Sequence, residues 1–485
     1  MKKLNAKFWT ILILVVVIVI GLTLTCVITA TASDRKRFVY ELNEDGLSYS
    51  VVGIKNAYRG GWFAKESIEV PQTYKGYPVT AIKQIRNLQK TQTVILPMGL
   101  KEIGASAFYA SSITSIVIPN SVETIGISAF ENCTQLSEVT LPESLTAISS
   151  ATFRSCFSLS KITLPSTVTS IGSEAFANCY ALESLTLPVN LATIETYAFL
   201  NCTGLTSIEL PSKLDFIGDN AFEKCFSLIE VCNNSMLNVV EGDDRNNGLV
   251  AQYALHVYSG SASSALIKKD NDVFYDNGDT VLFVKHYGTE TELTMPDFNG
   301  KEYAIHDYAF YGNSTLQEVT IPNSITKIGW HAFDNCSALK NVTIGDGVKL
   351  IDDEAFLSCK KLTDVTIGNS VERIGMKAFF ECERLEKIVL PDSVVIIDSE
   401  AFSWCAQLKD VTIGKGVKEI GERAFFNCTH FVELNYGGTV NQWKEVLLGD
   451  RWTWDNNSTK RDRSCEKVIC SDGEVEIPTT IKPAN

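Results

Sequence analysis

Ten cysteines occupy one position of a repeated phrase, and thiols held at a fixed position can do several kinds of chemistry. One such phrase is EAFANCYALESLTLP, residues 174–188, and the cysteines of this row are Cys133, Cys156, Cys179, Cys202, Cys225, Cys336, Cys359, Cys382, Cys405 and Cys428. The row could be a disulfide framework, a metal array, a set of nucleophiles or a stack of buried core thiols.

The spacing of the row favours core thiols. Neighbouring strands lie about 4.8 Å apart, so a disulfide between consecutive cysteines is geometrically feasible. Each run holds five cysteines, however, which leaves one over, and a regular disulfide row would strain the stack. Zinc needs ligands that converge from several sides, which a straight row of single cysteines does not supply. Buried free cysteine instead behaves as a small apolar residue. Cys465 and Cys470 lie outside the row and could form a separate pair.

The familiar catalytic motifs are missing from the sequence. The five histidines, at positions 256, 286, 306, 331 and 430, show no H-x-x-x-H spacing, and there is no G-x-S-x-G, Walker or G-x-G-x-x-G motif. The stretch EGDDRNNG (241–248) has the composition of a calcium loop, but Arg245 takes a ligand position and no distal glutamate fits. We therefore predict no enzymatic activity, no metal site and no cofactor.

Three tryptophans gather near the C-terminus, and two interpretations are open. Trp443, Trp452 and Trp454 could stack on sugars, because clustered indole rings present flat apolar faces. Tryptophans also plug the open end of a core, and the sequence favours this simpler role within a closing cap.

The elements that hold these side chains repeat with a constant period. Ala-Phe pairs, one of them replaced by Thr152-Phe153, begin at residues 107, 129, 152, 175, 198 and 221, and resume at 309, 332, 355, 378, 401 and 424. Every step within a run is 23 residues except one of 22. Such a period is typical of a solenoid, in which each unit buries its apolar face only by stacking on its neighbours.

One unit contains a short strand and two bends. In LSEVTLP (136–142), Val139 and Leu141 alternate with Thr140, which predicts a strand with the two apolar residues inward. Pro142 ends the strand because it has no N–H for the ladder. Leu145 then points inward on the return path. The unit is therefore predicted to be a compact coil without a long helix.

This pattern resembles the leucine-rich repeat superfamily, and within it the BspA-like branch of surface proteins. The resemblance rests on AFENCTQLSEVTLPESLTAI (129–148) and its eleven sister units, and it covers roughly residues 80–435. In the common leucine-rich repeat an Asn or Cys follows the strand, whereas here Pro or Gly follows it and the Cys precedes it. The fold class we expect is a β-rich solenoid of leucine-rich repeats of period 23, with short parallel strands, in two arrays that each open with a β-hairpin cap.

The repeat breaks between Phe222 and Phe310, and this break divides the chain. Residues 38–82 and 273–305 each carry an aromatic strand, an Asp/Asn-Gly turn and a second strand ending in Pro, which indicates a hairpin cap. We also expect short helices over 248–260 and in GGTVNQWKEVLLGD, and a hairpin across Ser471-Asp472-Gly473. The predicted parts are a leader (1–32), a cap (33–83), array 1 (84–229), an insert with the second cap (230–305), array 2 (306–435) and a closing cap (436–485).

Two outward positions on each strand are candidate binding positions. One position is mostly threonine, which pairs well with itself across strands and could equally be a stabilising surface row. The position two residues earlier varies from unit to unit while the core does not. The candidate residues are Glu138, Thr140, Lys161, Thr163, Ser184, Thr186, Glu209, Glu318, Thr320, Asn341, Thr343, Asp364, Thr366, Lys387, Asp410 and Thr412.

The N-terminus predicts export. Three lysines precede an uncharged run from Phe8 to Ala32, which is long enough to span a bilayer and also ends in Ala30-Thr31-Ala32, a signal-peptidase pattern. A cleaved signal peptide and an uncleaved anchor both export residues 33–485. Without its leader the chain carries 40 basic and 57 acidic residues, so its net charge of −17 disfavours nucleic acid as a partner.

The resemblance and the export signal together imply an extracellular or cell-surface binding protein. By resemblance, it would adhere to a protein or glycan on host cells, matrix or neighbouring cells, and it would use the strand face. The alternative is a structural spacer that presents the insert or the C-terminal tail and has no ligand of its own. The membrane would be contacted only through residues 8–32, if these are not cleaved.

Overall fold

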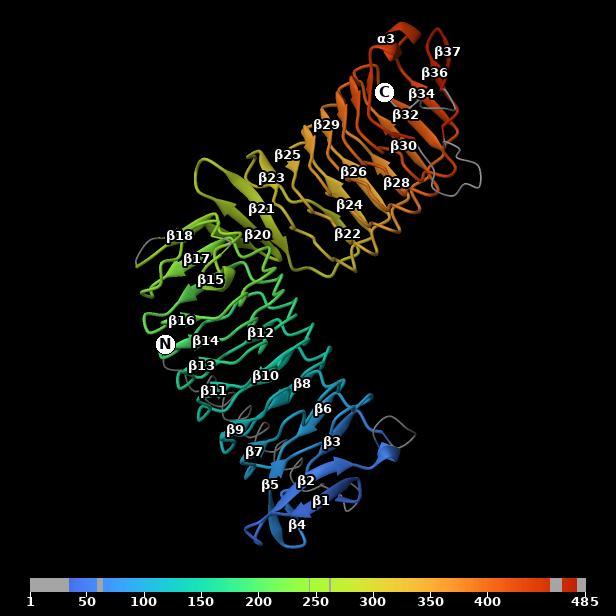
Figure 1. The fold of residues 1–485 in the computed structure, drawn as a ribbon. Helices are drawn as coiled ribbons and strands as arrows, with labels where there is room; N and C mark the ends of the chain where they lie inside the picture. The colour runs from blue at the N-terminus through green and yellow to red at the C-terminus, as the bar shows by residue number, and fades with distance from the viewer. Residues whose placement is uncertain (1–34, 59–63, 244, 261–262, 454–464, 478–485) are drawn as a thin grey trace, which may run out of the picture. The chain divides into compact units, whose positions relative to one another are not determined.

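The computed structural model describes residues 35–477, apart from 59–63, 244, 261–262 and 454–464 (Figure 1). The chain divides into two compact units, residues 1–262 and 263–485, and each has its own hydrophobic core. None of the helices in the described ranges is long and apolar enough to cross a membrane. The predicted leader, residues 1–32, lies outside the described residues.

A single coil shows how the repeat folds. Strand β10 (Glu138–Thr140) turns Val139 into the core and its two neighbours outward, and Pro142 follows the strand. Strand β11 (Ala147–Ile148) then carries the chain back along the other side of the coil. The next coil repeats the pattern 23 residues later, so β10 pairs in parallel with β12 (Lys161–Ile162). The predicted β-solenoid of period 23 is confirmed.

Stacking of the coils produces two ladders in the first unit, which we call the strand face and the return sheet. The strand face holds β3 (Ser67–Glu69), β6 (Thr93–Ile95), β8 (Ser115–Val117), β10 and β12, and then β15 (Ser207–Leu210), β17 (Glu230–Asn233) and β18 (His256–Tyr258). The return sheet holds β5 (Tyr77–Ile82), β7 (Glu102–Ile103) and β9 (Thr124–Ile125), and then, as a separate ladder, β11, β13 (Ser170–Ile171), β14 (Thr193–Ile194) and β16 (Phe216–Ile217).

The second unit repeats both ladders (Figure 1). Its strand face consists of β22 (Glu292–Thr294), β24 (Glu318–Ile321), β26 (Asn341–Ile344) and β28 (Asp364–Thr366), and a separate sheet of β30 (Lys387–Leu390), β32 (Asp410–Ile413), β34 (Glu433–Tyr436), β36 (Lys467–Cys470) and β37 (Gly473–Glu476). Its return sheet holds β23 (Tyr303–Ile305), β25 (Ile325–Ile328), β27 (Leu350–Ile351), β29 (Arg373–Ile374), β31 (Ile396–Ile397), β33 (Glu419–Ile420) and β35 (Leu447–Leu448).

A column of phenylalanine rings runs through each core. From Phe108 to Phe222, successive rings stack nearly parallel with centroids 5.0–5.5 Å apart. The second column begins in the cap at Phe283 and continues to Phe425, with centroids 4.6–5.4 Å apart. Aromatic pairs of this kind add roughly 0.5–1.5 kcal/mol beyond the burial of their area, so the column stabilises each coil against the next.

The corner of each coil uses two residues with left-handed backbone. One precedes the Ala-Phe pair and the other precedes the cysteine, as Glu174 (φ 57°) and Asn178 (φ 61°) show. Asparagine tolerates this conformation better than most residues, because its short polar side chain bonds locally. The recurring Asn before the cysteine therefore has a backbone explanation.

Antiparallel hairpins open both arrays, as predicted. In the first unit β1 (Phe38–Leu42) pairs with β2 (Tyr49–Ile54), and β2 joins the return sheet through β5. In the second unit β20 (Asp272–Asp276) pairs with β21 (Val281–His286), which joins β23 in the same way. A further strand, β19 (Leu266–Lys269), extends the second cap. The predicted boundaries between caps, insert and arrays stay a prediction.

The prediction of a helix over 248–260 is wrong. The segment starts with a 3-10 turn, η2 (Asn247–Leu249), and ends in strand β18, where Val257 lies opposite Val231 of β17. An edge strand offers unpaired backbone groups, and pairing with β17 outweighs the local helical pattern. Leu249 also has a left-handed φ of 65°, which interrupts a helix at its start.

The short helix and the hairpin predicted near the C-terminus are confirmed. A short helix, α3 (Val440–Lys444), starts with a capping box in which Thr439 and Gln442 exchange side-chain-to-backbone hydrogen bonds. The hairpin of β36 and β37 turns at Ser471 and Asp472. These elements cover the last coils of the second core.

Candidate functional site: the strand face

In each unit, the strand face arranges its share of the sixteen predicted residues in two rows. Fourteen of the side chains are exposed, and Asn341 and Thr412 are half-buried. Within each sheet the residues of a row lie directly opposite one another, because every strand repeats after 23 residues. Whether these residues bind a partner stays a prediction.

The threonine row is most regular in the second unit. Thr320, Thr343 and Thr366 follow one another on β24, β26 and β28 in register. Cross-strand pairs of β-branched residues contribute roughly 0.2–1 kcal/mol each, so this row stabilises the sheet whatever else it does. In the first unit Thr140 faces Val117, and Thr163 and Thr186 lie in the next coils.

The charged row varies from coil to coil. Glu138 lies opposite Lys161 in the first unit. In the second unit the Asn341 amide donates to Glu318 Oε1 at 2.8 Å, and Asp364 follows on the next strand. Lys387 and Asp410 continue the row on β30 and β32.

The strand face also has shallow hollows. One of about 560 Å³ lies between β10 and β12, where Glu138, Thr140, Lys161 and Thr163 line it. A smaller hollow of about 250 Å³ lies one coil further, beside Ser184 and Thr186. A third of about 450 Å³ lies in the second unit between β28 and β30. Ligand sites typically have volumes of roughly 300–1,000 Å³, so the two larger hollows are in this range. All three hollows are wide open to solvent.

The ten cysteines of the row do not contribute to this surface, and the core-thiol prediction is confirmed. All ten are buried and in the thiol form. Each Sγ donates to the carbonyl oxygen of the column phenylalanine in the preceding coil, at 3.1–3.4 Å. Burial raises the pKa of Cys133, Cys179 and Cys225 to about 12, so these side chains stay protonated and are poor nucleophiles at neutral pH.

Among the described residues of the C-terminal cap, there is no disulfide between Cys465 and Cys470 and no exposed tryptophan surface that could stack on a sugar. Cys465 and Cys470 are both buried thiols, and Cys465 donates to the carbonyl oxygen of Lys467 at 3.4 Å. Trp443 and Trp452 are buried with ring centroids 6.1 Å apart, so they close the core and have no open face for a sugar. Trp454 lies outside the described residues. Across residues 35–477, outside the gaps, no group of three His, Cys, Asp or Glu side chains could hold a metal ion.

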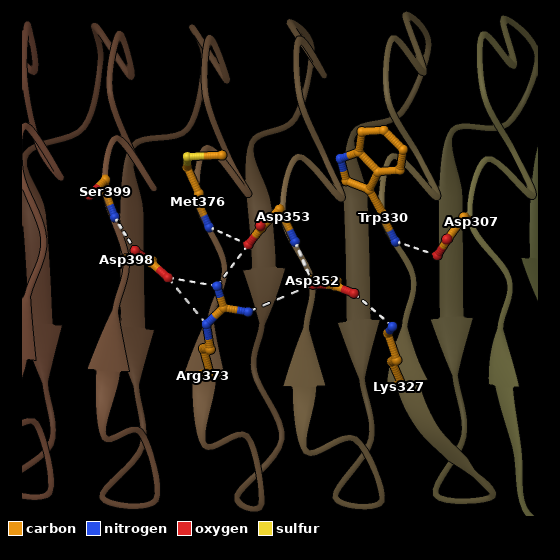
Figure 2. Close-up of polar contacts among 9 residues, drawn as sticks. All are labelled: Asp307, Lys327, Trp330, Asp352, Asp353, Arg373, Met376, Asp398 and Ser399. Carbon is orange, nitrogen blue, oxygen red and sulfur yellow. Dashed lines mark hydrogen bonds and ion pairs between the residues drawn. The ribbon is translucent and has the colours of Figure 1, made fainter. Parts of the chain in front are cut away.

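The return sheet of the second unit carries an ionic network that the repeat pattern did not predict (Figure 2). Arg373 Nη2 lies 2.6 Å from Asp398 Oδ2 and 2.9 Å from Asp353 Oδ1. Lys327 Nζ lies 2.7 Å from Asp352 Oδ2 on the same row. The network pairs two cations with three carboxylates and links neighbouring coils, so it is a brace on the side opposite the strand face. In the sequence, the network is indicated by an Asp that replaces the usual Gly after the inward Ile of the return strand, as at Asp352 and Asp398.

Comparisons with known proteins agree with this architecture. The model of the BspA type leucine-rich repeat region matches residues 66–182, 101–229 and 303–432, which together make up more than half of the chain. No curated protein matches the chain in sequence.

Several solved structures are similar to the chain. A leucine-rich cell surface protein from Faecalibacterium prausnitzii is 25% identical, with 85% of this chain and 96% of that chain covered and a TM-score of 0.37. A leucine-rich repeat protein from Bacteroides ovatus is 24% identical, with coverages of 85% and 96% and a TM-score of 0.32. The pneumococcal vaccine antigen PcpA is 17% identical, with coverages of 82% and 86% and a TM-score of 0.27. These TM-scores are low, and the family of the chain is shown by its match to the BspA-type repeat model. The chain belongs to the BspA-type leucine-rich repeat family.

Proposed function

We propose that this chain is an exported, cell-surface repeat protein that binds a macromolecular partner through its strand face and catalyses no reaction. The observation that carries the proposal is the contrast between an invariant core and a varied charged row held in register on one surface. A solenoid with a constant frame and variable outward positions is suited to extended binding surfaces. The family likewise suggests protein–protein interaction or adhesion.

The partner we propose is a protein or glycan on host cells, matrix or neighbouring cells. The net charge of −14 argues against nucleic acid, since the chain would repel a phosphate backbone. The acidic members of the row, Glu138, Glu318, Asp364 and Asp410, favour surfaces that carry basic groups.

Charge reversal on the strand face tests the proposal. Adhesion of the full chain to immobilised matrix proteins and to cells is measured for the triple variant E138K/D364K/D410K. The matched control is E102K/E372K/E419K, which places the same charge change on exposed glutamates of the return side. Adhesion that falls in the first variant alone supports the strand face. Equal adhesion of the wild-type chain and both variants would refute it and favour the spacer role.

Export is tested separately. N-terminal sequencing of the mature protein distinguishes cleavage after Ala32 from retention of residues 8–32 as an anchor. A mature chain found inside the cell with Met1 intact would contradict the proposed location without bearing on the strand face.

A further inference from the structure

Two of the hollows on the strand face have the same chemistry, one in each unit. The hollow between β10 and β12 is lined by Glu138 and Lys161 on neighbouring strands, with Thr140 and Pro165 beside them. The hollow between β28 and β30 is built alike, from Asp364, Thr366, Lys387 and Pro391. In both, a carboxylate on one strand is followed 23 residues later by a lysine, in the sequences EVTLP–KITLP and DVTIG–KIVLP.

Each hollow lies where the ladder between two neighbouring strands is short or missing. β10 and β12 pair only at Glu138–Lys161 and Val139–Ile162, so Thr140 and Thr163 lie just beyond the end of the ladder between these two strands. In the second unit the interruption is complete, because β28 ends one sheet and β30 begins the next.

The two lysines differ from the other lysines on this face. Lys340 Nζ donates to Gln317 at 2.7 Å, Lys409 lies 2.7 Å from Glu386, and Lys467 lies 3.0 Å from Glu433. Among the described residues, by contrast, no carboxylate lies within 4.0 Å of the amine of Lys161 or Lys387, and neither amine donates a hydrogen bond.

The two carboxylates are equally unengaged. Glu433 has its lysine and Glu318 has the amide of Asn341, whereas in the described part of the chain Glu138 and Asp364 have no side-chain partner. Each hollow therefore presents one cation and one anion on neighbouring strands that do not neutralise each other. Because these groups are held in no ion pair with each other, they give up no such contact when they turn to a partner.

We propose that each of these two hollows binds an extended peptide segment of a protein partner that presents one basic and one acidic side chain. The inference rests on the proposed binding function and specifies its ligand class. Glu138 or Asp364 receives the basic side chain, and Lys161 or Lys387 receives the acidic one. In an extended segment, residues i and i+2 point to the same side about 7 Å apart, a spacing that two neighbouring strands can meet. The threonine hydroxyls beside the pair offer hydrogen bonds to the peptide backbone.

Peptides of defined charge test the inference on the full chain. The probe is a fluorescent, terminally blocked peptide Ser-Thr-Lys-Thr-Glu-Thr-Ser, compared by anisotropy with peptides carrying Lys-Thr-Lys, Glu-Thr-Glu or Gln-Thr-Gln in its centre. We expect the Lys-Thr-Glu peptide to bind at least about threefold more tightly than each of the others. Equal binding of all four peptides, or of none at millimolar concentration, would overturn the inference.

A specificity switch gives the sharper result. In K161E/K387E both hollows hold two carboxylates, so the preferred peptide should change from Lys-Thr-Glu to Lys-Thr-Lys. The control K349E/K418E changes exposed lysines of the return side and should keep the wild-type preference. No difference between these two variants would refute the peptide site.

Adhesion measured in parallel separates this inference from the general function. If E138K/D364K/D410K loses adhesion while peptide preference never appears, the strand face binds but the peptide site is wrong. If peptide preference switches as expected while adhesion is insensitive to every variant, the hollows bind peptides but the adhesive function fails. Binding of an anionic polysaccharide that depends on Lys161 and Lys387, without peptide binding, would replace the peptide with a glycan.

Discussion

Cys179 donates its thiol hydrogen to the carbonyl oxygen of Phe153, with 3.2 Å between the sulfur and the oxygen. The same bond joins Cys202 to Phe176, and it recurs wherever the row cysteine is present. Each of these carbonyl oxygens also accepts the backbone N–H three residues further on, as Phe153 does from Cys156, so the thiol is a second donor to it. Cysteine thus adds a weak hydrogen bond between coils while it fills the space like an apolar residue.

Replacement of Cys179 by alanine should therefore destabilise the first unit by about 1–3 kcal/mol, from the lost bond and the cavity that remains. The measurement is the urea midpoint of unfolding, followed by circular dichroism. The control is C232A, because Cys232 is half-buried and lies outside the row. A C179A variant as stable as C232A would contradict the role of the thiol.

Alkaline pH should unfold the chain through its thiols. Burial raises the pKa of Cys133, Cys179 and Cys225 to about 12 from an ordinary value of 9.0. The unfolded chain therefore releases these protons first, so the stability they contribute is complete below about pH 9 and is lost as pH rises from about 9 to 12. Unfolding monitored by tryptophan fluorescence should fall within this window. Persistence of the native signal at about pH 12 would contradict the burial of the row.

Lys285 should have the opposite pH dependence. Its side chain is buried, and desolvation lowers its pKa from 10.5 to about 8. At about pH 7 the amine is charged in both states, so the fold bears the cost of a buried charge, and this cost disappears as pH rises from about 8 to 10.5. We expect K285M to stabilise the second unit by about 1–3 kcal/mol near pH 7, with the gain shrinking by about pH 9.5. A gain that does not change with pH would point to packing instead.

Arg373 should matter more than a single surface cation. Its Nη2 joins Asp353 and Asp398 from neighbouring coils, while Nε also donates to Asp398 and Nη1 lies 3.7 Å from Asp352 (Figure 2). A lysine amine has only one nitrogen and cannot reproduce this set of contacts. We expect R373A to lower the unfolding free energy by about 1–2 kcal/mol, R373K to recover less than half of this, and K349A to have almost no effect. Equal midpoints for R373A and K349A in about 0.1 M salt would show that the network is not stabilising.

Much of the fold could be predicted because residues close together in the sequence determine the structure of each coil, and the same coil is repeated many times. The alternation of Val139 and Leu141 around Thr140 and the break at Pro142 determine the strand, and the constant step of 23 residues determines the register. The helix expected over 248–260 failed for a non-local reason. Its last residues pair with the edge of β17, and the residues of the segment itself give no indication that this edge is available.

The sequence by itself determined the coil, the two hairpin caps and the burial of the cysteine row, since these follow from periodicity and residue type. Only the tertiary structure decided where the strand ladders are short or missing. It likewise decided that Lys161 and Lys387 have no carboxylate partner in the described part of the chain, whereas Lys409 has its glutamate. It also decided that Lys285 is buried and that Arg373 braces two coils. The physical reason is that these contacts depend on the distances and angles between strands of neighbouring coils. The partners lie about one repeat of 23 residues apart in the chain, and no local pattern in the sequence determines their distance in space.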